Sequence, residues 1–197
     1  MRSVILNFFL LISVSCFSQF TSVELESNFS SKQIKDLEKI TIFFKTQLCK
    51  NEAAEFSACV NNLLPEIKKG YYEFIIERID YNEQLRLYQS ISQNTFFEIW
   101  AFCVITNHIN DKKFKSLCSS GANKKYTNFL SQVGLNNKYI AYYAKNIISS
   151  GDFSSSLSFI DTLLDTISDE EINSPNIQLI IAIQMLTIND QIKQSKN

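Results

Sequence analysis

Glycine and proline are scarce in this chain of 197 residues, which contains four glycines and two prolines. A β-sandwich or β-barrel turns about every 8–12 residues and normally uses many more of both. The composition therefore excludes these folds, together with collagen-like and low-complexity chains. The glycine-rich loop that cradles phosphate in common nucleotide-binding motifs is missing as well.

Histidine and net charge are also nearly absent, since the chain has one histidine, His108, and a formal net charge of −1. A global basic field that would recruit nucleic acid is therefore missing, so we expect no nucleic-acid partner. The densest basic stretch could suggest such a surface, but the export expected below argues against it. Its residues are Lys112, Lys113, Lys115, Lys124 and Lys125. No nucleophile motif accompanies His108, which favours a structural or solvated histidine over a general base. We expect no enzyme activity and no cofactor.

The first 18 residues have the order of a secretory signal peptide. Arg2 is followed by an apolar stretch, Val4–Val14, and then by small residues up to Ser18. The apolar stretch is too short to span a bilayer, so we expect cleavage after Ser18 and export to the periplasm or the medium. A lipid anchor on Cys16 is the alternative for an exported chain, and a buried N-terminal helix is the alternative without export.

Membrane spanning is not expected elsewhere in the chain. The most apolar later segment, residues 176–188, is short and contains Gln178, Gln184 and Thr187. A transmembrane helix needs about 20 predominantly apolar residues.

Four cysteines remain once residues 1–18 are set aside, and an even number in an exported chain predicts two disulfides. A zinc site is the weaker reading, because no two cysteines have the C-x₂₋₄-C spacing of such sites. Antiparallel helices joined by a short turn bring residues equidistant from the turn within reach of a bridge. Two pairs flank expected turns in this way, Cys49 with Cys59 near Asn51 and Cys103 with Cys118 near Asn110.

Apolar residues recur every three or four positions from Ser30 onward, which predicts an all-α fold. We expect a linker at residues 19–29, one helical domain at residues 30–190 and a flexible tail at residues 191–197. Pro65 should divide two helices, because proline and the residue before it both disfavour a helix interior. Helices are also expected at about residues 94–104 and 111–118. We expect helices to start at Ser30, Asp80 and Ser174. We expect helices to end at Gly121, Gly134 and Gly151.

Two of the expected helical hairpins resemble tetratricopeptide repeats. They span Ile67–Gln93 and Lys138–Ser168. The second hairpin has three features of that family. Ala144 is the small residue of the first helix, Gly151-Asp152-Phe153 matches the turn, and Ser156 is the small residue that follows it. The resemblance implies helical hairpins stacked as a short α-solenoid, and an irregular helical bundle is the alternative.

In that family, the first helix of each repeat lines a concave groove that binds a peptide. Carried over by position, the resemblance implies a groove formed by Lys69, Glu73, Ile76, Glu77, Tyr142, Lys145 and Ile148. We therefore expect an exported scaffold that binds another protein or a peptide. An inhibitor or immunity-type protein that blocks one enzyme or toxin is the first alternative, and it would present one large exposed patch. A cryptic hydrolase is the second, and it would have a deep pocket lined by carboxylates or around His108.

Overall fold

The fold is mostly helical, with an antiparallel pair of strands near the middle of the chain. The computed structural model describes residues 20–50, 55–106, 112–153 and 157–196. In chain order the elements are α1 (Val23–Asn28), α2 (Ser31–Cys49), α3 (Phe56–Glu77), α4 (Tyr81–Ser90), α5 (Gln93–Ile99), β1 (Trp100–Thr106), β2 (Lys113–Ser119), α6 (Lys125–Val133), α7 (Lys138–Ser150), α8 (Leu157–Thr166), α9 (Asp169–Ile172) and α10 (Pro175–Ser195). None of the described helices is long and apolar enough to cross a membrane.

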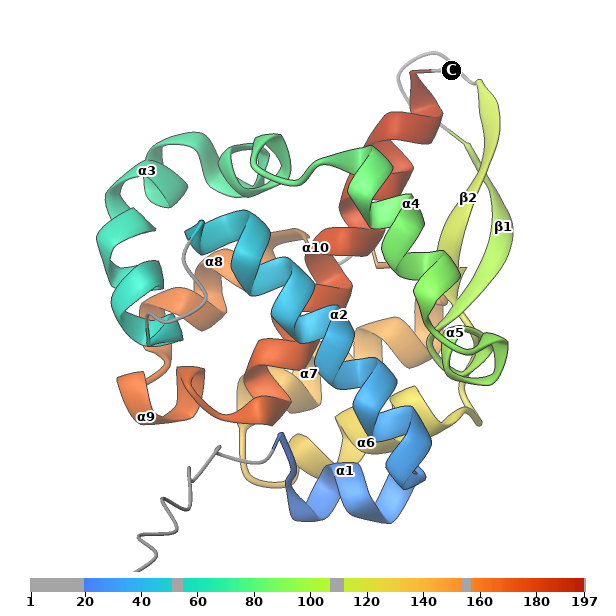
Figure 1. Ribbon diagram of the computed structural model, residues 1–197, viewed down its shortest axis with the longest axis horizontal. Coiled ribbons are helices and arrows are strands. Elements are labelled where there is room, and N and C mark those ends of the chain that lie inside the picture. Colours follow the sequence, from blue (N-terminus) through green and yellow to red (C-terminus); the bar gives the residue numbers. More distant parts are fainter. Residues whose placement is uncertain (1–19, 51–54, 107–111, 154–156, 197) are drawn as a thin grey trace, which may run out of the picture.

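Helix α10 is the centre of the molecule, and the other elements are arranged around it (Figure 1). Every residue from Ile177 to Gln191 is buried. The neighbours that cover the helix are α2, α3, α4, α9 and β2. A helix buried on all sides needs apolar residues around its whole circumference, which the isoleucines and leucines of this segment provide.

Polar residues on α10 are buried too, and each bonds to a different neighbour. Gln184 accepts a hydrogen bond from the Tyr143 hydroxyl at 2.8 Å and donates to the Phe153 carbonyl at 3.0 Å. Thr187 accepts from the indole N–H of Trp100 at 2.8 Å. A buried polar group without a partner is costly, so these bonds favour one arrangement of the neighbours around α10.

Several helix starts agree with the sequence. Ser30 forms the expected capping box with Gln33, and Asp80 accepts from the backbone N–H groups of Asn82 and Glu83. Ser174 caps α10, with Pro175 in its first turn. These caps satisfy N–H groups that a helix leaves without intrahelical partners.

The two predicted flexible segments are wrong. Residues 19–29 contain α1 instead of a linker, and Leu25 of this helix and Phe29, which follows it, are buried. Helix α10 continues to Ser195, and the Gln191 amide donates to the Leu117 carbonyl at 2.9 Å, instead of a tail beginning at residue 191. Both segments have too few apolar residues for a periodic pattern, so contacts distant in sequence stabilise them.

The predicted break at Pro65 is also wrong, because α3 continues through it from Phe56 to Glu77. Proline removes one intrahelical hydrogen bond and displaces the preceding turn, which commonly bends a helix without ending it. In Figure 1, α3 is visibly curved.

The helices predicted at residues 94–104 and 111–118 are replaced by α5 and a β-hairpin. Strand β1 pairs with β2 in an antiparallel register in which Cys103 lies opposite Ser116. Five of the seven residues of β1 are aromatic or β-branched, a composition typical of strands. Trp100 and Val104 are four residues apart, and residues at that spacing lie on the same face of a strand as well as of a helix. The pattern therefore could not separate the two structures.

The glycines fulfil their predicted roles in part. Gly151 ends α7 in the left-handed conformation, with φ of +68°. Gly134 ends α6 in the right-handed conformation instead, and a Cβ there would lie 2.8 Å from Cα of Ala141. Glycine is needed at that position for the close approach of α6 and α7. Gly121 follows β2 and ends no helix.

Both predicted disulfides are confirmed. Cys49 and Cys59 join the end of α2 to the start of α3, with Cα atoms 5.7 Å apart. Cys103 and Cys118 join β1 to β2, with Cα atoms 5.9 Å apart. The second pairing was right although the predicted helices were wrong, because antiparallel strands also bring residues on the two sides of a turn close together. The register places Cys103 opposite Ser116, so the bridge is diagonal.

Candidate functional site

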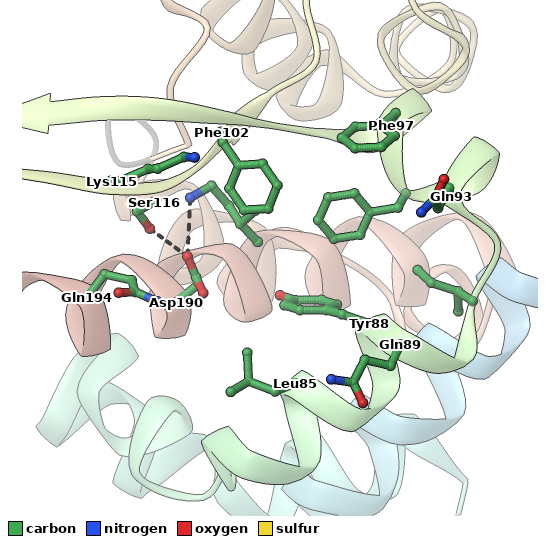
Figure 2. Close-up of a pocket in the computed structure, with 13 residues that line it drawn as sticks. Leu85, Tyr88, Gln89, Gln93, Phe97, Phe102, Lys115, Ser116, Asp190 and Gln194 are labelled. Carbon is green, nitrogen blue, oxygen red and sulfur yellow. Dashed lines mark hydrogen bonds between the residues drawn. The ribbon is translucent and has the colours of Figure 1, made fainter.

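A pocket of about 540 Å³ lies between the hairpin and the helices α4, α5 and α10 (Figure 2). Its volume is within the range of ligand-binding pockets. Most of its wall is apolar or aromatic. The lining residues are Leu85, Tyr88, Gln89, Ile91, Gln93, Phe96, Phe97, Phe102, Lys115, Ser116, Leu117, Asp190 and Gln194.

An aromatic cluster forms one wall of this pocket, with Phe96 at its centre. The ring centroid of Phe96 lies 5.5 Å from that of Tyr88, 5.2 Å from that of Trp100 and 5.9 Å from that of Phe102. Aromatic pairs at such distances add to the stabilisation from burial. The wall is therefore a packed part of the core that continues to the surface.

Large apolar side chains remain exposed around the pocket mouth. Phe102 is 56% exposed and Phe97 is 47% exposed, and Leu85 is exposed on the opposite side. Figure 2 shows the two phenylalanine rings on the hairpin side and Leu85 on the α4 side. Contiguous exposed apolar surface around a cavity is typical of an interaction site. We call Leu85, Phe97 and Phe102 the apolar rim.

Asp190 lies at the base of the pocket, where its carboxylate accepts three hydrogen bonds. The Ser116 hydroxyl donates at 2.6 Å, the Leu117 backbone N–H at 3.2 Å and the Tyr81 hydroxyl at 2.8 Å. Burial together with the bond to Asp190 raises the pKa of Tyr81 to about 12, so this phenol remains a donor at neutral pH. The carboxylate is therefore engaged in holding the hairpin and α4 against α10.

The polar groups of Tyr88 and its neighbours are engaged in the same way. The Gln84 amide donates to the Tyr88 hydroxyl at 2.8 Å and to the Leu186 carbonyl at 2.8 Å. Asn189 in turn donates to the Gln84 carbonyl oxygen at 2.7 Å. Burial raises the pKa of Tyr88 well above its usual value, so its phenol stays neutral.

Lys115 gives the pocket a positive charge. Its ammonium lies 5.1 Å from the centroid of the Phe102 ring, a cation–π contact at the surface. The ion pairs found among the described residues do not include Lys115. The pocket thus offers apolar walls and one cation to whatever occupies it.

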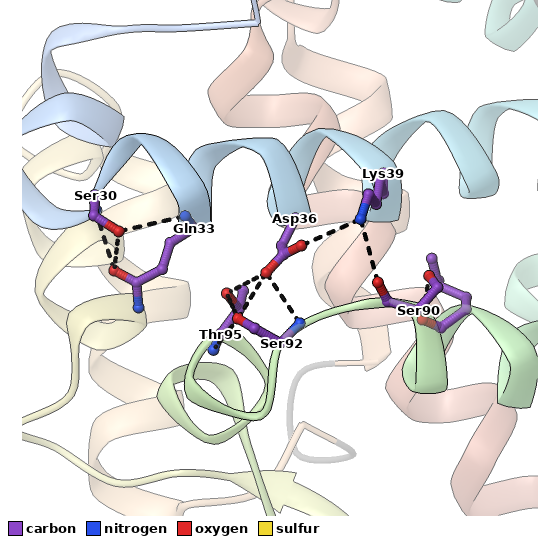
Figure 3. Close-up of polar contacts among 8 residues, drawn as sticks. Ser30, Gln33, Asp36, Lys39, Ser90, Ser92 and Thr95 are labelled. Carbon is purple, nitrogen blue, oxygen red and sulfur yellow. Dashed lines mark hydrogen bonds and ion pairs between the residues drawn. The ribbon is translucent and has the colours of Figure 1, made fainter.

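Asp36 on α2 positions α5, the helix that leads into the hairpin (Figure 3). One of its carboxylate oxygens accepts from the Ser92 backbone N–H at 3.0 Å, the Ser92 hydroxyl at 2.7 Å and the Thr95 hydroxyl at 2.8 Å. Lys39 lies 3.5 Å from the other oxygen and also donates to the Ser90 carbonyl at 3.2 Å. The turn between α4 and α5 is therefore fixed to α2, which sets the position of the pocket wall.

The groove residues implied by the repeat resemblance lie elsewhere. Lys69, Glu73 and Glu77 are exposed on α3, whereas Ile76 is buried in the core and cannot contribute to a groove. None of the seven lines the pocket. The three members of the set on α7, Tyr142, Lys145 and Ile148, are exposed.

The two groove sets are on helices separated by a third element. Helix α8 packs against both α3 and α7. The groove that would join the two sets remains a prediction. Tyr142, with 67% of its side chain exposed, is the most accessible aromatic of the α7 set and serves below as a control.

Sequence reasoning missed the apolar rim. The three- to four-residue spacing of apolar residues assigns Leu85 and Phe97 to inward-facing helix stripes, and it assigns no role to Phe102. The signal available was the high content of aromatic and β-branched residues in Trp100–Thr106, which favours a strand with alternate residues exposed.

His108 lies outside the described residues. Within the part of the chain that the structure describes, no three His, Cys, Asp or Glu side chains are grouped so that they could hold a metal ion. Comparison with protein families, curated proteins and solved structures finds no match to this chain.

Proposed function

We propose that this protein is an exported, non-catalytic binding protein, and that its pocket receives an apolar side chain of a protein or peptide partner. The observation that carries the proposal is the combination of a preformed aromatic wall with an exposed apolar rim. Such a surface is costly to leave in water and stabilises a complex when a partner covers it.

The base of the pocket supports binding rather than catalysis. A hydrolase needs a carboxylate or imidazole free to move a proton. Asp190 is the carboxylate in the lining, and its oxygens are engaged by Ser116, Leu117 and Tyr81. These polar groups support the fold of the pocket and leave its apolar surface for recognition.

The two disulfides support the exported location. Disulfides persist mainly in oxidising compartments such as the periplasm and the extracellular space. Cys49–Cys59 and Cys103–Cys118 each join two different elements of the fold.

An inhibitor or immunity-type protein is the second candidate, favoured by the exposed patch on the hairpin. Phe102 and Val104 project from one face of β1, and Phe97 precedes them. A scaffold and an inhibitor would use the same surface, so the experiment below locates the surface for either.

The proposal is tested with peptides selected from a random phage-displayed library against the oxidised full chain. Affinities of the selected peptides are then measured for the wild type, for Phe102→Ser in the apolar rim and for Tyr142→Ser on α7. Burying a phenylalanine contributes about 1.5–3 kcal/mol, so Phe102→Ser should weaken binding roughly 10- to 100-fold. Tyr142→Ser is the matched control and should change binding less than about twofold.

Two outcomes would contradict the proposal. If Tyr142→Ser abolishes binding and Phe102→Ser does not, the partner uses the α7 face implied by the repeat resemblance. If the selection enriches no peptide above an unrelated disulfide-linked protein, the pocket is not a peptide-binding site.

A further inference from the structure

The outer edge of β2 is already occupied. The Leu117 backbone N–H donates to Asp190 at 3.2 Å, and the Leu117 carbonyl accepts from the Gln191 amide at 2.9 Å. The Ser119 N–H donates to the Gly151 carbonyl at 2.9 Å. Side chains of α10 and the end of α7 thus take the place of a third strand next to β2.

These bonds show which backbone groups of β1 point away from β2. In an antiparallel pair, opposite residues alternate between those that bond to each other and those whose N–H and C=O both point outward. Leu117 bonds outward, so its opposite residue Phe102 also presents its N–H and C=O on the far side. The alternation gives Val104 and Thr106 the same orientation. We call these three residues the free edge of β1.

No further strand pairs with the free edge in the described part of the chain. The sheet consists of β1 and β2, and Figure 1 places β1 on the outer margin of the molecule. Proteins normally protect a strand edge with charged residues, proline or a bulge. The sequence of β1, WAFCVIT, contains no charged residue and no proline, and its register with β2 is unbroken.

The free edge lies beside the pocket of the proposed function. Phe102 belongs to both, and Val104, which is 70% exposed, continues the same strand face. The Cys103–Cys118 disulfide holds β1 to β2 and so keeps the edge in place. An extended segment paired with β1 would therefore have alternate side chains directed toward the apolar rim.

We infer that the partner binds by strand addition, as an extended segment with apolar residues and acidic side chains that pairs with the free edge of β1. This inference rests on the proposed function. The charge preference comes from Lys113 and Lys115, which lie opposite Thr106 and Val104 and share their strand face. Backbone hydrogen bonds supply affinity in this mode, and alternate side chains supply specificity.

The same charges disfavour a second copy of this chain as the occupant. Antiparallel pairing of two β1 strands would bring Lys113 and Lys115 of both copies to one continuous sheet. No acidic residue in β1 would compensate them. The lysines would lie on the two outer strands of that sheet, so each copy would add positive charge and no acidic group. A partner with acidic side chains fits the edge better, because the Lys115 ammonium lies over the Phe102 ring of β1.

The first experiment uses the peptides that bind the wild type and lose affinity with Phe102→Ser. Each is resynthesised with single N-methyl groups at successive residues. Methylation of an N–H that pairs with β1 should lower affinity roughly 3- to 10-fold, since one backbone hydrogen bond contributes about 1 kcal/mol. Methylation of the intervening residues should change affinity less than about twofold, which produces an alternating pattern.

The second experiment changes the edge of the protein itself. Val104→Pro removes an outward N–H without removing a bond to β2, and an edge strand tolerates proline at such a position. It should weaken peptide binding about 10-fold, whereas Val104→Thr keeps the N–H and should bind within about twofold of the wild type. Circular dichroism and the melting temperature of the free protein check that both variants fold.

The outcomes separate the two proposals. Peptides that need Phe102 but show no alternation on N-methylation would overturn strand addition and leave the pocket function standing. A wild-type dimer in sedimentation velocity that Val104→Pro dissociates would assign the edge to a second copy and overturn the acidic partner. The acidic partner would also be overturned if the selected peptides are not enriched in Asp and Glu and if Lys115→Gln leaves their affinity unchanged.

Discussion

Asp36 illustrates how one buried side chain fixes the position of a distant segment. Burial raises the pKa of its carboxyl, but hydrogen bonds from Ser92 and Thr95 outweigh burial and leave the pKa below its ordinary value. The folded-state pKa is therefore lower than the unfolded-state pKa. A carboxylate of this kind contributes stability that is fully present above the unfolded pKa, near 3.8, and is lost as the pH falls through the folded pKa.

Replacement of Asp36 by Asn should lower the free energy of unfolding at pH 7 by about 2–3 kcal/mol, because the charge-assisted bonds to Ser92 and Thr95 are weakened or lost. The difference between wild type and variant should shrink as the pH falls below about 4, because the Asp36 carboxyl is protonated there in the unfolded chain and at still lower pH in the folded protein. Urea unfolding at several pH values measures both effects. Lys39→Gln is the control, since Lys39 is half exposed and should change stability by less than about 1 kcal/mol. A pH-independent difference would contradict the assignment.

Thr187 offers a second test at this scale, because it accepts the indole N–H of Trp100. Thr187→Val keeps the shape but leaves that buried N–H without a partner, so it should destabilise the protein by about 1–3 kcal/mol. Thr41 is buried on α2 and bonds to the Leu37 carbonyl of its own helix, as Thr187 does to Ile183. Thr41→Val makes the same chemical change without an indole partner and should cost about 1 kcal/mol or less.

Urea unfolding gives the stability of both threonine variants. The fluorescence of Trp100, the one tryptophan of the chain, reports the indole environment and should shift in Thr187→Val alone. Equal losses of stability in the two variants would show that the Trp100 bond contributes nothing.

Among the elements, the hairpin departs furthest from expectation. Its cysteine pairing was predicted correctly and its secondary structure was not, because residues that flank a turn come close together in a helical hairpin and in a β-hairpin alike. In the observed register Cys118 lies opposite Ala101 and not opposite Cys103, so the disulfide is diagonal. Sequence spacing alone does not predict this offset of two residues.

Removal of the hairpin disulfide should affect binding as well as stability. The double variant Cys103→Ala with Cys118→Ala opens a loop with a sequence separation of 15 and should lose about 3 kcal/mol in the chain-entropy account. Cys49→Ala with Cys59→Ala, with a separation of 10, should lose about the same amount. Only the first double variant should weaken the peptides selected against the pocket, because only that bridge holds the free edge. Equal weakening by both would contradict this role.

For the molecule as a whole, helix starts and the disulfides were predictable from sequence, and the assembly was not. Ser30, Asp80 and Ser174 act locally, so their patterns are sufficient. The central position of α10 depends on partners far away in the chain. Asp190, for example, accepts from Tyr81 across 109 residues. The candidate site was missed for the same reason, since its walls come from α4, α5, β1, β2 and α10, which only the assembled fold brings together.

The end of α10 provides a test at this scale. Deletion of residues 191–197 removes Gln191 and its bond to the Leu117 carbonyl, together with the Gln194 bond to the Tyr81 hydroxyl. The truncated protein should be destabilised by about 2 kcal/mol or more, because buried groups lose their partners. Deletion of Lys196 and Asn197 alone should leave the melting temperature within error. If deletion of residues 191–197 leaves the stability unchanged, these residues form the flexible tail that the sequence predicts.

The place of α10 in the chain has a consequence for biosynthesis. Helices α2, α3, α4 and strand β2 all precede the helix that covers their apolar faces. A growing polypeptide therefore exposes these faces until synthesis has passed the last of them, and contacts this distant in sequence form slowly. Cooperative folding must wait for α10, so under the proposed export the chain would still be unfolded when it enters a translocation channel.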